Sequence, residues 1–63
     1  DAYTVLGVAR GLSDREYKVA YLKLAKTCHP DMNPGDKDAT ARFQAVSASY
    51  EKVKDAAARA RYE

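Results

Sequence analysis

The sequence predicts an all-α domain in which two long antiparallel helices form a hairpin, flanked by short N- and C-terminal helices. Two observations carry this prediction. Apolar residues recur at steps of three and four along residues 13–28 and again along residues 39–57, which is the period of one helix face. Residues 29–35 between them contain two prolines, an asparagine and a glycine, a composition typical of a loop. No strand pattern and no internal repeat is present.

A short helix is predicted at residues 1–7. Tyr3, Val5 and Leu6 form an apolar cluster there. Asp1 precedes the cluster as an N-cap, and Gly7 follows it as a C-cap. The segment therefore offers one to two turns of helix.

The first long helix has a strong start signal at Ser13. The Ser13 side chain can accept from the amide of Glu16, and Glu16 can reach back to the amide of Ser13, which is a capping box. Leu12 and Tyr17 occupy the positions of a hydrophobic staple. The apolar stripe then continues through Tyr17, Tyr21, Leu24 and Cys28. Pro30 ends the helix, because the residue before a proline is displaced from helical geometry.

The second long helix is predicted to begin after Asp36 or Asp38, either of which can cap it. Its apolar stripe comprises Ala39, Phe43, Val46, Tyr50, Val53 and Ala57. The two stripes match in length, so the helices should pack antiparallel. Lys54 and Asp55 either break this helix, with Asp55 capping a last short helix through Tyr62, or the alanine-rich sequence lets it continue.

Length and composition indicate one small domain over residues 1–63, monomeric in isolation. A chain this short buries only about 60% of its unfolded surface, so its stability should be modest. The single cysteine excludes an internal disulfide and fits a reducing, intracellular compartment, whether cytoplasm or an organelle. No apolar run approaches the roughly 20 residues that span a bilayer, so no direct membrane contact is expected. Because a helix is predicted from the first residues, we expect a fragment of a longer protein.

The net charge of +2 is too small to indicate a nucleic-acid-binding protein, but its distribution is uneven. Four basic residues and one acid lie between residues 15 and 26, whereas the signs balance from residue 31 onward. The basic residues are Arg15, Lys18, Lys23 and Lys26. On a helical wheel Lys18, Leu22 and Lys26 share a solvent-facing strip that points toward His29. This arrangement suggests an acidic partner surface.

His29, Pro30 and Asp31 lie at the tip of the predicted hairpin. Pro30 restricts one backbone angle and so limits the positions that the imidazole of His29 and the carboxylate of Asp31 can take relative to each other. Such a loop can make directional hydrogen bonds and one charge pair with a partner. Taken alone, the triplet is better explained as a helix end followed by a turn.

Enzymatic and metal-binding functions are disfavoured. Cys28 and His29 resemble a thiol–imidazole pair, but Cys28 lies on the apolar stripe, where a thiol is expected to belong to the core. One cysteine and one histidine do not match a recognisable metal site. We therefore predict no catalytic residue and no metal. A small helical nucleic-acid-binding domain is the alternative, although the nearly neutral second long helix argues against it.

The whole chain resembles a J-domain, the module of DnaJ-type co-chaperones. The matching motifs are Asp1-x-Tyr3-x-x-Leu6-Gly7-Val8, Ala20-Tyr21-x-x-Leu24-Ala25, His29-Pro30-Asp31, Asn33-Pro34-Gly35-Asp36, Arg42-Phe43, Tyr50-Glu51 and Arg59-Ala60-x-Tyr62. In register with these flanking motifs, the triplet is highly specific.

The resemblance implies binding to the ATPase domain of a DnaK-type chaperone of the heat shock 70 family and stimulation of its ATP hydrolysis, coupled to client folding. It also implies that the chain needs no cofactor. By position, His29, Pro30 and Asp31 would transmit the signal. The implied docking residues are Arg15, Lys18, Tyr21, Lys23 and Lys26. Leu22 and Thr27 depart from the family, which often has basic residues at these positions, so this helix face carries fewer positive charges than is usual. Ala56 replaces a frequent proline, which leaves open whether the last two helices merge.

Overall fold

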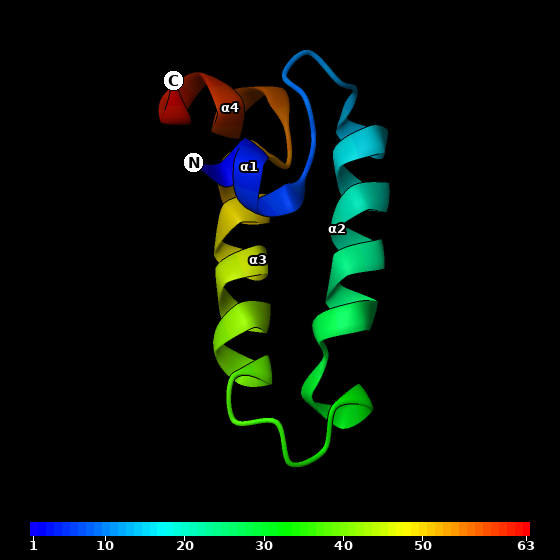
Figure 1. The fold of residues 1–63 in the computed structure, drawn as a ribbon. Helices are drawn as coiled ribbons and strands as arrows, with labels where there is room; N and C mark the ends of the chain where they lie inside the picture. The colour runs from blue at the N-terminus through cyan, green and yellow to red at the C-terminus, as the bar shows by residue number, and fades with distance from the viewer.

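The computed structural model describes all 63 residues and contains only helices and loops. The elements in order are α1 (Ala2–Leu6), α2 (Asp14–Cys28), the 3₁₀ turn η1 (Pro30–Met32), α3 (Ala39–Val53) and α4 (Ala56–Tyr62). Helices α2 and α3 run antiparallel and are joined at one end by the segment that contains η1 (Figure 1). The predicted all-α hairpin with short flanking helices is confirmed, and the predicted loop additionally holds one 3₁₀ turn.

The predicted caps of the first two helices are present. The Asp1 carboxylate accepts the N–H of Thr4 at 2.9 Å, and Gly7 ends α1 in the left-handed region at φ +68°. At the start of α2, the N–H of Glu16 donates to Ser13 Oγ and the N–H of Ser13 donates to Glu16 Oε1, both at 3.1 Å. This reciprocal capping box confirms the sequence signal.

The start of α3 differs from the prediction. Asp38 occupies the N-cap position but makes no side-chain cap bond, because its backbone is already helical (φ −88°, ψ −12°) rather than extended. The Asp36 carboxylate accepts the N–H of Asp38 at 2.9 Å and binds the guanidinium of Arg42 at 2.6 Å. Asp36 therefore connects the turn before α3 to the first turn of the helix without acting as its N-cap.

Asp55 separates α3 from α4. Its backbone is extended (φ −147°, ψ 172°), and its carboxylate accepts the N–H of Ala58 at 2.7 Å. Of the two alternatives that the sequence left open, the break at Asp55 is present and the continuous helix is wrong. Ala57, assigned to the apolar stripe of α3, is exposed, and Ala58 is buried instead. The break resets the helical register, so the stripe does not extend across it.

The core lies where α1 and α4 cover the end of the hairpin away from η1 (Figure 1). It comprises Ala2, Tyr3, Leu6, Tyr17, Val46 and Val53. Val5, predicted to join the α1 cluster, is exposed instead. The helix turns it away, since it follows the buried Tyr3 by only two residues. Cys28 is half-buried and packs against the core, as expected.

None of the helices has the combination of length and apolar character that crossing a membrane requires.

Candidate functional site

The loop after α2 owes its shape to Pro30. His29 leaves the helical region (φ −59°, ψ 133°), as expected for a residue before proline, and α2 ends at Cys28. Pro30 then begins η1, where its missing N–H is not needed. The N–H of Met32 donates to the His29 carbonyl at 3.0 Å, and the N–H of Asn33 donates to the Pro30 carbonyl at 3.2 Å. The triplet is therefore held in an ordered turn.

Asn33 ties this turn to the end of α2. Its Nδ2 donates to the carbonyl of Thr27 at 2.8 Å and to the carbonyl of His29 at 3.0 Å. Both acceptors belong to the end of the helix, where carbonyls lack partners within the helix. The sequence analysis assigned Asn33 no such role. The available signal was an amide side chain a few residues after a helix end, which can bond to nearby backbone.

The backbone of Asp31 orients the ring of His29. His29 Nδ1 accepts the N–H of Asp31 at 3.1 Å and lies 3.7 Å from Asp31 Oδ2. A nitrogen that accepts carries no proton, so the neutral ring holds its proton on Nε2. The ring meets Phe43 edge-on, with centroids 5.3 Å apart. The side chains of His29 and Asp31 are 44% and 90% exposed, so the loop offers a donor and a carboxylate to solvent.

A first hollow, of about 570 Å³, lies between α2, η1 and α3. It is lined by Tyr21, Leu22, Ala25, Lys26, His29, Asp31, Met32 and Phe43. The structure thus brings two residues of the loop triplet together with two of the expected docking residues, Tyr21 and Lys26. Pro30 does not line the hollow and acts on it through the backbone.

Tyr21 also holds the hairpin together. Its ring stacks on Tyr50 of α3, with centroids 4.4 Å apart and an interplanar angle of 9°. Its hydroxyl lies 3.4 Å from Ser47 Oγ. The side chain is half-buried, so only part of it faces the first hollow. A change at Tyr21 therefore alters the packing of α2 on α3 as well as the surface.

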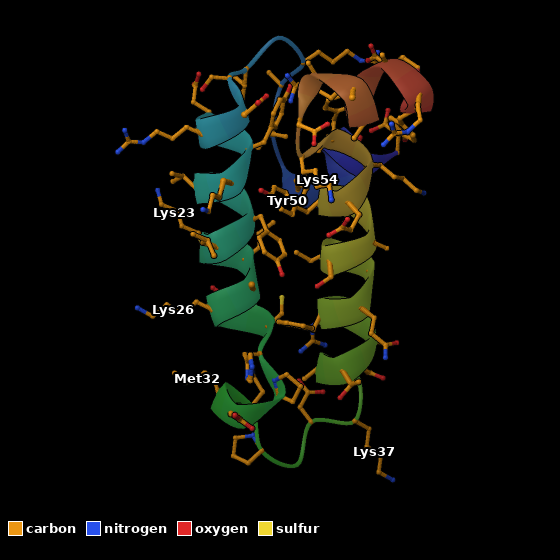
Figure 2. The ribbon with its side chains drawn as sticks, turned by 180° about the vertical axis from the view of Figure 1, so that it is seen from behind. Lys23, Lys26, Met32, Lys37, Tyr50 and Lys54 are labelled. Carbon is orange, nitrogen blue, oxygen red and sulfur yellow. The ribbon has the colours of Figure 1, made fainter.

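The other basic residues line two further hollows. Arg15 and Lys18 face a second hollow, of about 520 Å³, together with Lys54, the residue that follows α3. Lys23 faces a third hollow, which Arg15 also lines. Figure 2 shows Lys23 and Lys26 on the outer side of α2, with Lys54 on the neighbouring helix. The basic residues thus form one band along α2 rather than a single cluster.

Lys54 was missed in the sequence analysis. The signal lay in the hairpin itself, because antiparallel packing places the end of α3 beside the start of α2, and hence Lys54 beside Lys18. Lys54 donates to Glu51 Oε2 at 2.9 Å, and this hydrogen bond raises the pKa of Lys54. Its charge is therefore partly neutralised within α3.

The four basic residues of α2 have no such partner. Arg15, Lys18, Lys23 and Lys26 take part in none of the ion pairs of the chain. Their charge is available to an acidic surface. No group of three or more His, Cys, Asp and Glu side chains lies close enough together to hold a metal ion. The arrangement is suited to binding another macromolecule through charge, a rigid loop and an apolar hollow.

Comparisons with known proteins agree with this geometry. The family model described as DnaJ domain matches residues 1–63. The chain is 57% identical over its full length to a chaperone protein DnaJ of Acetivibrio thermocellus. It is also 51% identical to one of Ruminiclostridium cellulolyticum and 48% identical to one of Desulfitobacterium hafniense. The chain spans 16% to 17% of the length of these relatives.

Proposed function

The chain belongs to the DnaJ domain family, and from that membership we propose that it is a co-chaperone domain that binds a DnaK-type chaperone and stimulates its ATP hydrolysis. The observation that carries the proposal is the loop of His29 and Asp31, ordered by Asn33 and joined to a basic helix face. The domain has no catalytic step of its own in this proposal, and nucleotide stays with the partner.

The physical account of stimulation is differential binding. The domain must bind one conformation of the partner better than another, since a ligand shifts an equilibrium only by its difference in affinity. Each tenfold stimulation of hydrolysis corresponds to about 1.4 kcal/mol of preferential stabilisation of the activated state. An ordered loop serves this role, because the ring of His29 is already oriented before contact and the Asp31 carboxylate beside it is exposed.

The basic band of α2 supplies recognition. Arg15, Lys18, Lys23 and Lys26 would steer the domain onto an acidic patch of the partner. The uneven charge also argues against general binding of nucleic acid, since the second long helix carries little net charge. We further propose an intracellular location, which the single free thiol supports.

The test is single-turnover ATP hydrolysis by a purified bacterial DnaK-type chaperone, with and without the domain. The natural domain should stimulate hydrolysis. His29→Gln should abolish the stimulation, because glutamine lacks the ring that accepts from Asp31 and contacts Phe43. Lys37→Ala, an exposed change in the same loop region, is the matched control and should stimulate normally.

Two results would contradict the proposal. One is no stimulation by the natural domain with any of several DnaK-type chaperones. The other is equal stimulation by the His29→Gln variant. Tight binding of the domain to duplex DNA or RNA at physiological salt would favour the alternative of a nucleic-acid-binding domain.

A further inference from the structure

Exposed apolar side chains gather on the proposed docking face. The four large apolar residues that remain exposed are Val5, Val19, Leu22 and Met32. Three of them line the hollows of α2 and η1, and only Val5 lies elsewhere. Leu22 and Met32 are the most exposed of the set, at 52% and 65%. An exposed apolar group of this kind marks an interaction site more often than a single scattered residue does.

Leu22 makes this apolar surface continuous. It lines the first hollow together with Met32, and it lines the second hollow together with Val19. Ala25 and Phe43 form further apolar lining of the first hollow. An apolar strip therefore runs along α2 and ends beside the loop triplet. Figure 2 shows Met32 on the same outer side of the hairpin as Lys26.

Cations border the strip along its length. Lys26 lies at the first hollow, and Lys18 lies at the second, both without an ion-pair partner in the chain. The one acid of the second hollow, Asp14, is already paired with Arg59 at 2.7 Å. An apolar centre with a charged rim is the usual anatomy of a specific protein interface.

We propose that Leu22 and Met32 are specificity-determining residues that contact aliphatic side chains of the partner chaperone, at a place where carboxylates of the partner pair with Lys18 and Lys26. This inference rests on the proposed function and names the chemistry of the surface that the domain selects. Charge brings the partners together, and the apolar contacts decide which acidic surface is held.

The test replaces each residue by glutamine, which is similar in length, neutral and compatible with a helix. Leu22→Gln and Met32→Gln should each raise the concentration needed for half-maximal stimulation of a purified bacterial DnaK-type chaperone roughly tenfold. The maximal rate at saturation should not change, because the loop triplet is intact. Val5→Thr, an exposed apolar change on α1, is the matched control and should leave both values as they are.

Two further measurements separate recognition from folding and from charge. The thermal unfolding of both variants should match that of the natural domain, since exposed side chains contribute little to stability. The salt dependence of binding should keep its slope, because no charge is altered. If a variant with weaker binding also changed the salt slope of binding or the thermal stability, the assignment of Leu22 and Met32 as contact residues would be overturned.

The outcomes distinguish this inference from the proposed function. Stimulation by the natural domain with an unchanged half-maximal concentration for both variants overturns the inference and leaves the function standing. A fall in maximal rate, rather than in affinity, also overturns it, since the residues would then act in activation. If the natural domain neither binds nor stimulates any such chaperone, both are overturned.

Discussion

Single side chains decide how the His-Pro-Asp loop is held. Asn33 satisfies two carbonyls at the end of α2 through one amide group, and His29 accepts the N–H of Asp31. On the other side of the loop, Asp36 accepts the N–H of Asp38 and binds Arg42. Each of these bonds is local, yet together they connect the end of α2 to the start of α3. The loop is therefore ordered by polar contacts.

Asp36 makes the stability of the domain depend on pH. The hydrogen bond from Arg42 lowers the pKa of Asp36 below its ordinary value of 3.8. A carboxyl whose folded pKa is lowered stabilises the fold above its unfolded pKa and loses that contribution as pH falls through the folded pKa. Asp36→Asn should therefore be less stable than the natural domain at pH 7, and the difference in stability should vanish once pH falls below the folded pKa of Asp36. Urea unfolding at several pH values measures this difference.

Asp38→Asn provides the control for this measurement, because the Asp38 side chain makes no cap bond. It should unfold like the natural domain across the same pH range. A stability gap for Asp36→Asn that stayed constant down to low pH would show that the ionised carboxylate is not its cause.

At the scale of elements, the helices differ in how firmly their ends are secured. The capping box of Ser13 and Glu16 starts α2, and Asp55 starts α4 through its bond to Ala58. Helix α3 begins without a side-chain cap and relies instead on the buried contacts of its stripe. The two kinds of start predict losses of stability of different size when the N-cap aspartate is replaced by alanine.

Asp55→Ala should destabilise the domain by about 1 kcal/mol, because it removes an N-cap whose bond separates α3 from α4. Asp38→Ala, at an N-cap position without a cap bond, should cost less than about 0.5 kcal/mol. Chemical denaturation of the two variants side by side gives the comparison. Equal losses for both would mean that the bond to Ala58 contributes nothing.

At the scale of the whole molecule, the core and the loop triplet lie at opposite ends of the hairpin. The N–H of Ala2 donates to Tyr62 Oη at 2.9 Å, and Tyr3 Oη donates to Glu63 Oε1 at 2.9 Å, so both termini close over the core (Figure 1). Arg59 adds to this end by binding Asp14 and the Val53 carbonyl. The loop end has fewer buried side chains, which leaves its surface open to a partner.

The charge of the whole molecule predicts salt-dependent binding to the partner. Lys26→Ala should weaken binding at low salt by roughly two- to fivefold, mainly through slower association, and the loss should shrink as salt screens the charge. Lys37→Ala removes the same charge from a position pointing away from this face (Figure 2) and should bind normally. Association rates measured at several salt concentrations test both. If the natural domain associated with the partner at the same rate at every salt concentration, the expected electrostatic steering would be contradicted.

Much of the fold was readable from sequence because its signals are local. The capping box at Ser13 and the stop before Pro30 each depend on a few adjacent residues, whereas the sequence left the break at Asp55 open. Predictions were wrong where neighbouring geometry decided the outcome. Asp38 is not a side-chain cap because its backbone is helical, and Ala57 is exposed because the helix restarts after Asp55.

The candidate site was predictable only in part. The loop triplet and the basic residues of α2 lie within short stretches of sequence, and their use in binding a chaperone stays a prediction. Phe43 of α3 and Lys54, which follows α3, lie more than ten residues further along the chain than the loop triplet. Phe43 belongs to the predicted apolar stripe, but the pattern did not place it beside His29, because packing of the two helices sets its position.

By itself, the sequence determined the two long helices and the loop between them, since periodicity, caps and prolines act over a few residues. Its motifs, in register along the whole chain, carried the resemblance to the family. Only the tertiary structure decided which side chains share a surface. It placed Leu22 and Met32 around one hollow with the loop triplet, and it placed Lys54 beside Lys18. The reason is physical: the relative rotation of two packed helices depends on all the contacts between them.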